Sequence, residues 1–203
     1  MKYRGISNNP QARARITSPY VTWTGGFTEE QVNKIAAYCQ QTELEAGITW
    51  GGLNEDIRTS KINWQAWCEE IAWFFDGINE LITRINNGWY GFDLNGYQHF
   101  QYAEYSAEEK GKFDWHMDLF MGNEIPKGFY EPRKLSITVL LNEPGVDFEG
   151  GEFQFKYGVD EHTVDCKKGH VIAFPSWMIH RVTPVTKGVR KSIVIWVEGP
   201  KFV

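Results

Sequence analysis

The sequence predicts an α+β protein in which helices pack on an antiparallel sandwich or barrel. Two features predict this class. Apolar residues occur at helical spacing in the first half, and after Asn87 short β-rich runs are separated by Gly, Pro and Asn turns. The 203 residues suit one domain and contain no internal repeat, low-complexity tract or linker. We therefore expect a single domain over residues 1–203.

The N-terminal segment, residues 1–19, carries basic side chains and no acid, and it is predicted to be an irregular arm. The start of the chain lacks the apolar region that secretory signal peptides contain. No apolar run approaches the length of a membrane span. These observations favour a cytoplasmic protein, in a host cytoplasm if the chain is viral, with no membrane partner.

Two helices are expected in the first half of the chain. Thr28 and Gln31 form a capping box in front of apolar residues at helical spacing, which predicts a helix from about Glu29 to Glu45, ended by Gly47. A second helix is predicted from about Trp64 to Asn86. Its apolar stripe consists of Trp67, Ile71, Phe74, Ile78, Leu81 and Ile85.

The second half is predicted to be β-structure. The expected strands are 97–105, 112–118, 134–142, 151–157, 170–174, 178–184 and 190–198. Gly150 and Gly151 lie in no phosphate-binding motif, so this pair is interpreted as a bulge or tight turn.

The composition limits the classes of function. A net charge of −5 gives no support for nucleic-acid binding through bulk electrostatics. The three cysteines, Cys39, Cys68 and Cys166, are far apart and form no CxxC pair, which disfavours a cysteine zinc site and a disulfide framework. We expect reduced, mostly buried thiols.

Three side chains are candidate metal ligands. His116 and Asp118 lie two positions apart in FDWHMDLF, on a predicted strand, so their side chains are expected on the same face. His180, in FPSWMIHRV, follows a strand that ends at a Pro175 turn. Two neutral imidazoles and one carboxylate leave three positions of an ion open, an arrangement typical of Fe(II) oxygen chemistry.

Arg190 strengthens this interpretation. It lies ten positions after His180, at the start of a strongly β-forming run. An arginine that points into the interior of a barrel needs a carboxylate partner, which its planar guanidinium binds through two hydrogen bonds. A dicarboxylate cosubstrate such as 2-oxoglutarate would provide that partner.

Several segments carry a family resemblance. They are IRTSKINW (57–64), QYAEYSAEEKGKFDWHMD (101–118), RKLSITVLLN (133–142), FEGGEF (148–153) and GHVIAFPSWMIHRVTPVTKGVRKSIVIWVEGP (169–200). Together the chain resembles, over about residues 27–200, the prolyl 4-hydroxylase-like branch of the 2-oxoglutarate and Fe(II)-dependent oxygenases. It is similar to short bacterial and phage-encoded members.

The resemblance implies a double-stranded β-helix, or jelly roll, with its core at residues 97–200 and with N-terminal helices packed on one sheet. It also implies that His116, Asp118 and His180 are the iron ligands. In the first of these segments, Arg58 matches the family pattern, and a place in the substrate groove and a structural salt bridge are both open for it.

The resemblance likewise assigns the cosubstrate site. It implies that Arg190 binds the C5 carboxylate of 2-oxoglutarate and that Tyr105 contacts the cosubstrate. Ser192 follows Arg190 by two residues on the same strand face, so it can share that carboxylate. Thr138 is a further candidate for the same site.

The function implied is a dioxygenase that hydroxylates an unactivated C–H bond of a prolyl residue in a peptide or protein, or of a small molecule, and releases succinate and CO2. Its cofactors would be Fe(II), 2-oxoglutarate and O2, with ascorbate as a further family expectation. The alternatives are a same-fold oxygenase acting on nucleic acid or another amino acid, a zinc hydrolase, and a metal-binding jelly roll without turnover. The acidic charge disfavours nucleic acid, and the presence of all three ligands and Arg190 disfavours a module without turnover.

Overall fold

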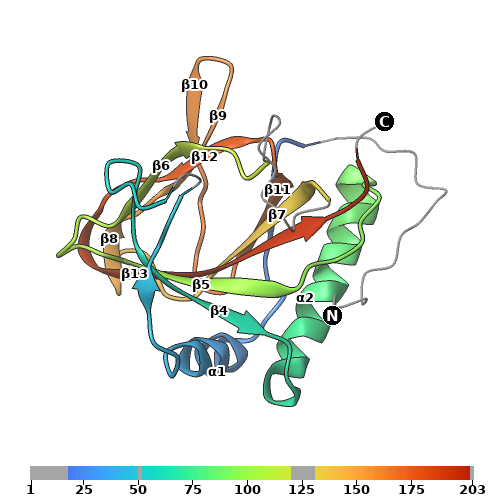
Figure 1. Cartoon of the computed structure of the whole chain (residues 1–203), viewed down its shortest axis with the longest axis horizontal. Coiled ribbons are helices and arrows are strands. Elements are labelled where there is room, and N and C mark those ends of the chain that lie inside the picture. The colour runs from blue at the N-terminus through green and yellow to red at the C-terminus, as the bar shows by residue number, and fades with distance from the viewer. Residues whose placement is uncertain (1–17, 50–51, 120–130, 202–203) are drawn as a thin grey trace.

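The computed structural model describes residues 18–49, 52–119 and 131–201, and within them two antiparallel sheets (Figure 1). The larger sheet has the order β1-β11-β7-β13-β5-β4-β2, with β8 paired to β13. Its strands are β1 (Val21–Trp23), β2 (Glu45–Ala46), β4 (Lys61–Ala66), β5 (His99–Ser106), β7 (Arg133–Leu140), β8 (Phe148–Gly150), β11 (Val171–Pro175) and β13 (Val185–Glu198).

The smaller sheet has the order β10-β9-β12-β6-β3. Its strands are β3 (Arg58–Thr59), β6 (Lys112–His116), β9 (Phe153–Tyr157), β10 (Asp160–Thr163) and β12 (Ile179–Val182). The two sheets face each other across a shared apolar cluster, in which Tyr105 and Phe174 of the larger sheet meet Phe155 and Val182 of the smaller one. The sandwich expected from the sequence is therefore present.

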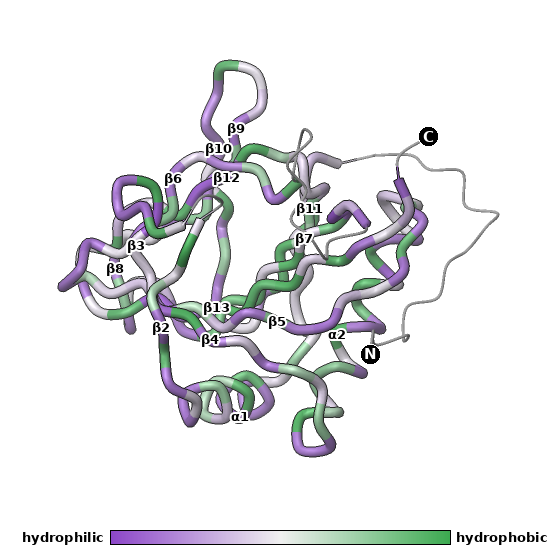
Figure 2. Tube along the Cα trace, in the orientation of Figure 1, coloured by the Kyte–Doolittle hydropathy of each residue, from purple (hydrophilic) through white to green (hydrophobic). Residues whose placement is uncertain are grey.

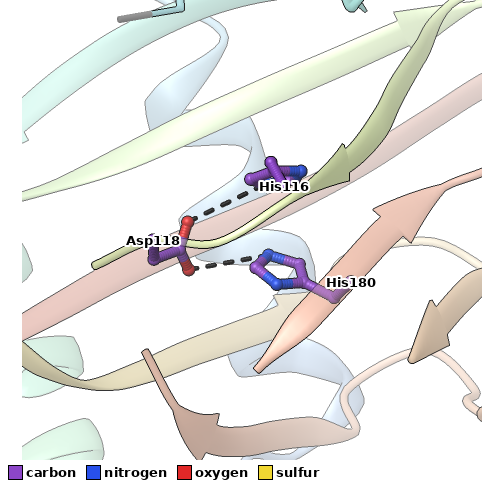
Figure 3. Close-up of side chains that lie close together, drawn as sticks. All are labelled: His116, Asp118 and His180. Carbon is purple, nitrogen blue, oxygen red and sulfur yellow. Dashed lines mark ion pairs between the residues drawn. The ribbon is translucent and has the colours of Figure 1, made fainter. Parts of the chain in front are cut away.

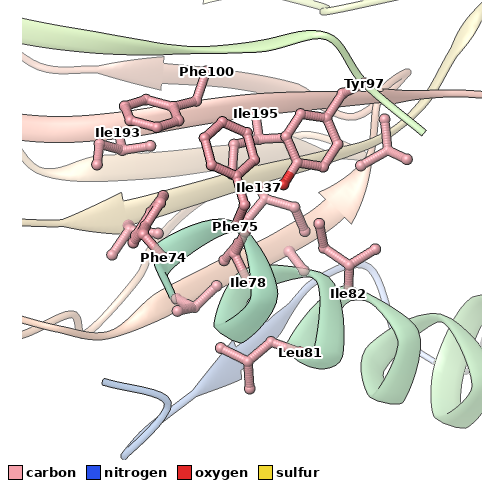
Figure 4. Packing of buried hydrophobic residues seen from close by; sticks show 14 of the residues in the cluster. Phe74, Phe75, Ile78, Leu81, Ile82, Tyr97, Phe100, Ile137, Ile193 and Ile195 are labelled. Carbon is pink, nitrogen blue, oxygen red and sulfur yellow. The ribbon is translucent and has the colours of Figure 1, made fainter. Parts of the chain in front are cut away.

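Both helices cover the outer face of the larger sheet. They are α1 (Glu29–Cys39) and α2 (Ala72–Ile85), with a short 3-10 turn, η1 (Glu69–Ile71), before α2 and a π-helical turn, η2 (Asn86–Tyr90), after it. Along α1 and α2 hydrophobic and hydrophilic residues alternate from one side to the other (Figure 2). Phe74 and Ile78 of α2 pack against Ile137 and Ile195 of the sheet, all fully buried (Figure 4). This core fixes the sheet whose opposite face points toward the candidate site.

The first helix is shorter than predicted. The Thr28 capping box with Gln31 is present, but the helix ends at Cys39 and not near Glu45. The reason is a side chain from β4. The Asn63 Nδ2 amide donates to the carbonyls of Cys39 and Thr42, which satisfies acceptors that a longer helix would have bonded internally.

The predicted start of the second helix was wrong. Residues 61–66 form β4, which pairs along its whole length with β5, and α2 begins only at Ala72. Trp67, placed in the apolar stripe, is 47% exposed, whereas the stripe from Ile71 onward is buried. Buried polar residues on β4, Asn63 and Gln65, obscured the alternation that would have marked a strand.

The predicted strands of the second half are all present with shifted ends. The main differences are that β6 stops at His116, short of residue 118, and that β13 begins at Val185. Strands β1 to β4 precede residue 97, so both sheets extend beyond the core expected at 97–200. The interpretation of Gly150 and Gly151 holds, because both have positive φ and the β8–β13 register shifts between Val185 and Lys187.

Other expectations concern the thiols, the arm and the membrane. The cysteines are free, although of the three only Cys39 is fully buried. The predicted arm lies almost wholly outside the described residues. Among the described residues, no helix is both long enough and apolar enough to cross a membrane.

Replacing Ile78 by Ala should lower the free energy of unfolding by about 2–5 kcal/mol, because it leaves a cavity between α2 and the larger sheet. Urea unfolding measures this change. The control is Glu80→Ala on the exposed side of the same helix, which should stay within about 0.5 kcal/mol of the parent protein. A similar loss in both variants would contradict the assignment of this face to the core.

Candidate active site

Three potential metal ligands meet where β6 and β12 pair. His116 ends β6, His180 lies on β12 directly opposite it, and Asp118 follows two residues after the strand end. His116 Nε2 lies 3.7 Å from Asp118 Oδ1, and His180 Nε2 lies 3.6 Å from Asp118 Oδ2 (Figure 3). One ligand atom from each residue lies within 4.8 Å of the other two, close enough to hold one metal ion.

The local backbone explains why these side chains converge. Three steps along β6, from Phe113 to His116, pair with two steps along β12, from Val182 to His180, which is a β-bulge. The bulge turns Phe113 and His116 to the same side, where their rings stack at 3.5 Å with an angle of 9°. Asp118 lies beyond the end of the strand. The alternation of side chains between faces, expected over 112–118, is therefore not what brings Asp118 to the same side as His116.

Backbone carbonyls fix the orientation of both imidazoles. His116 Nδ1 lies 2.7 Å from the carbonyl of Asp114, and His180 Nδ1 lies 2.8 Å from the carbonyl of Met178. A carbonyl only accepts, so Nδ1 carries the proton in each ring. The lone pair is thereby left on Nε2, the atom that faces Asp118 and that a metal would use.

The charges at this site suit metal binding at neutral pH. Burial, together with the nearby His180, lowers the pKa of His116 to about 3, so its imidazole is neutral. Burial raises the pKa of Asp118, but the two histidines, Arg133 and a hydrogen bond from Ser136 outweigh it and hold the pKa below its ordinary value. The site therefore offers a carboxylate and a neutral imidazole, the forms that bind metal ions.

Arg190 is a buried cation in the same pocket. It lies on β13 opposite Tyr105 and is 3% exposed. Its Nη1 donates to Ser192 Oγ at 2.9 Å, and its guanidinium lies 5.6 Å from the Tyr105 ring centre. Burial lowers its pKa, and none of the described residues gives it an acidic partner. Gly151, with φ +64°, allows close approach, because a Cβ there would lie 2.9 Å from Arg190 Cδ.

All the predicted site residues line one pocket. The pocket brings the three candidate ligands together with the proposed cosubstrate residues Arg190, Tyr105, Ser192 and Thr138. The last two are buried, and both come from the inner face of the larger sheet. The residues predicted from the sequence to form the site are therefore neighbours in space, although they span residues 105–192.

The pocket also contains Arg58, whose place the sequence left undecided, and Gln101, which was not predicted to be a site residue. Arg58 is 5% exposed and donates to Gln101 Oε1 at 2.7 Å and to Ser60 Oγ at 2.8 Å. Its guanidinium lies 4.7 Å above the Phe113 ring. Two places were open for Arg58, the substrate groove and a structural salt bridge. The described residues contain no salt bridge for it, and Arg58 lines the pocket. Gln101 lies four residues before Tyr105 on β5, so both side chains are on the same face of the strand. This spacing could have identified Gln101.

The pKa of His116 predicts how the metal-free protein responds to acid. Its folded value of about 3 lies below the ordinary 6.5, so between these pH values the unfolded chain binds more protons than the folded one. The free energy of unfolding should therefore be highest above pH 6.5 and fall as the pH drops toward 3. Urea unfolding of metal-free protein over this range tests it.

The matched variant is His116→Gln, which removes the titrating imidazole and should make the dependence on pH shallower. An equally steep dependence in the variant would show that other groups cause it. The lowered pKa of Asp118 affects only the acidic end of the range.

Part of the chain is similar in sequence to a known family. Residues 100–198 match the model of the 2OG-Fe(II) oxygenase superfamily. A PKHD-type hydroxylase of Xylella fastidiosa is 35% identical over 97 residues, which cover 45% of this chain and 41% of that protein. A PKHD-type hydroxylase of Alteromonas mediterranea is 44% identical over 65 residues, or 32% of this chain and 28% of that protein. The chain thus spans less than half the length of these curated relatives.

Solved structures share the fold over most of the chain. A prolyl-4-hydroxylase of Pseudomonas putida superposes with a TM-score of 0.72 at 22% identity, over 91% of this chain and 95% of that one. The 2OG complex of a viral collagen prolyl hydroxylase from Paramecium Bursaria Chlorella virus-1 gives 0.66 at 18%, over 90% and 97%. The jelly roll with N-terminal helices is thereby confirmed, and the His116–Asp118–His180 group fits the Fe(II) that the family name specifies. Residues 100–198 thus carry the sequence pattern of the 2OG-Fe(II) oxygenase superfamily, and the chain has the fold of these solved prolyl hydroxylases.

Proposed function

We propose that this chain is a 2-oxoglutarate- and Fe(II)-dependent dioxygenase that hydroxylates an unactivated C–H bond. The observation that carries the proposal is Arg190, a buried cation that shares a pocket with the three candidate ligands and has no acidic partner among the described residues. Such a cation is costly unless a ligand pairs with it. A dicarboxylate would satisfy Arg190 with one end while its other end reaches the metal position.

Each side chain has a distinct part in this proposal. His116, His180 and Asp118 would hold the iron through two Nε2 atoms and a carboxylate oxygen. Arg190 would bind the C5 carboxylate of 2-oxoglutarate, with Ser192 Oγ already within hydrogen-bond distance of its guanidinium. The bound iron and cosubstrate would supply the oxidising chemistry that hydroxylates the substrate and releases succinate and CO2.

Aromatic rings also shield the histidines from water, which would protect a reactive oxidant at this site from side reactions. The Phe174 ring lies 4.6 Å from the His180 ring, the Phe153 ring stacks on it at 5.5 Å, and the Phe113 ring covers His116. Tyr105 and Thr138 line the same pocket, and we propose that they contact the cosubstrate.

The proposed substrate is a prolyl residue of a peptide or protein, or a small molecule. Two comparisons support a peptide. The curated relatives are named PKHD-type hydroxylases, and a similar fold is a Trichoplax adhaerens prolyl hydroxylase in complex with a peptide fragment of hypoxia inducible factor. That structure superposes with a TM-score of 0.71 at 18% identity, over 90% of this chain and 84% of that one. Three points remain predictions: that nucleic acid is not a substrate, that ascorbate is used, and that the location is cytoplasmic.

We also propose that the chain forms a single oxygenase domain. The support is the packing of α1 and α2 on the sheet that contains β1, Arg190 and Thr138, with one continuous apolar cluster between the helices and this sheet. The helices would then be part of the catalytic domain and not a separate module.

The cosubstrate role of Arg190 predicts the effect of its replacement. Under anaerobic conditions, the Fe(II)-loaded protein should develop a weak visible charge-transfer band when 2-oxoglutarate is added. Arg190→Lys should require about ten-fold or more 2-oxoglutarate for the same band, because a point charge replaces a charge-assisted pair worth about 1.5–3 kcal/mol. Arg181→Lys, at an arginine paired with Glu161 outside the pocket, is the matched control and should titrate like the parent protein.

The ligand set makes a second prediction. His180→Ala removes an Nε2 ligand, so Fe(II) should bind much more weakly and no hydroxylation should occur. Isothermal titration with Fe(II) under anaerobic conditions measures the first effect, and succinate release measures the second. Parent-like metal binding in this variant would remove His180 from the ligand set. Metal binding without any charge-transfer band in the parent protein would instead reject the cosubstrate.

A further inference from the structure

Asp118 turns its two oxygens toward different histidines. Oδ1 lies 3.7 Å from His116 Nε2, and Oδ2 lies 3.6 Å from His180 Nε2 (Figure 3). Carboxylates bind metal ions through one oxygen or through both. The positions of these atoms alone would permit either arrangement, so some other contact must decide how many oxygens Asp118 gives to an ion.

That contact comes from Ser136 on β7. Its Oγ lies 2.7 Å from Asp118 Oδ2, and the residue is fully buried between β11 and β13. An ionised carboxylate has no proton to give, so the Ser136 hydroxyl must be the donor. A central strand paired on both sides holds Ser136 in place, which makes its hydroxyl a rigid donor to one particular oxygen.

A second serine orients the first. Ser176 Oγ lies 3.0 Å from Ser136 Oγ, and because the only hydroxyl proton of Ser136 is used on Asp118, Ser176 must donate to Ser136. The Ser176 carbonyl accepts from the backbone N–H groups of Asp118 and Leu119, both at 2.9 Å. The turn after β11 therefore holds Asp118 through its backbone and, by way of Ser136, through its side chain.

The same turn also orients His180. Two residues after Ser176, the carbonyl of Met178 accepts from His180 Nδ1. One short segment thus positions two of the three candidate ligands. Ser136 and Ser176 do not line the pocket themselves, so they act on the site through these ligands.

We propose that Ser136 is a positioning residue that occupies Asp118 Oδ2 and so limits Asp118 to one metal-binding oxygen, Oδ1. The inference rests on the proposed function for its consequence. With two imidazoles and one oxygen, a six-coordinate ion keeps three positions for other ligands, which a chelating cosubstrate and O2 require. With both oxygens bound, one of these positions is lost.

The test compares Ser136→Ala, Ser136→Thr and Tyr90→Phe with the parent protein, all loaded with Co(II) in place of Fe(II). Two quantities are measured: the visible Co(II) spectrum and the affinity of the loaded protein for 2-oxoglutarate. Ser136→Ala should retain Co(II), change the spectrum and bind 2-oxoglutarate about ten-fold more weakly or worse. Ser136→Thr keeps the hydroxyl and should restore both.

Tyr90→Phe is the matched control, because it removes a buried hydroxyl that donates only to the Ala173 carbonyl, on the helix side of the larger sheet. It should have the parent spectrum and affinity. A parent-like spectrum and parent-like affinity in folded Ser136→Ala would overturn the proposal. If Ser136→Ala does not fold, Ser176→Ala should shift both quantities in the same direction, and no shift would overturn the proposal equally.

The outcomes separate this inference from the proposed function. If the parent protein binds Co(II) but no 2-oxoglutarate, the dioxygenase proposal fails. The Co(II) spectrum of Ser136→Ala still reports how Asp118 binds the ion. A changed spectrum then supports the role of Ser136, and an unchanged one rejects it.

Discussion

The pairing of β6 with β12 is the constraint on which the site depends. It sets His116 opposite His180, and the bulge at the end of β6 turns Phe113 and His116 inward together before the chain leaves the sheet toward Asp118. Backbone pairing alone thus positions both imidazoles, without any contribution from a bound ligand. The helices contribute indirectly, since their core on the outer face of the larger sheet holds β7 and β13 in register behind the pocket.

Much of the fold could be predicted, since its local signals are strong. The Thr28 capping box marked the start of α1, and turn residues separated the strands of the second half. The errors arose where tertiary contacts override local pattern. Asn63 ends α1 from a strand that lies 24 residues beyond Cys39, and that strand hides its periodicity by burying polar side chains. No local spacing encodes such a contact.

The candidate site was more predictable than the fold boundaries, because chemistry restricts residue types more than it restricts strand ends. His116, Asp118 and Arg190 were identified from their types and spacing, and they do share a pocket. Ser136 could not be found in this way. A serine in an apolar strand has no distinctive sequence signal. The role of Ser136 depends on its contacts with Asp118 and with Ser176 of the turn after β11, which only the folded chain brings together.

The buried guanidinium of Arg190 links the free energy of unfolding to the concentration of anionic ligands in solution. A cation held among neutral groups reduces the stability of the ligand-free state, and an anionic ligand that binds only the folded chain restores it by mass action. With the cosubstrate role proposed for Arg190, the lifetime of the protein in a cell would depend on how much of the acidic metabolite is present.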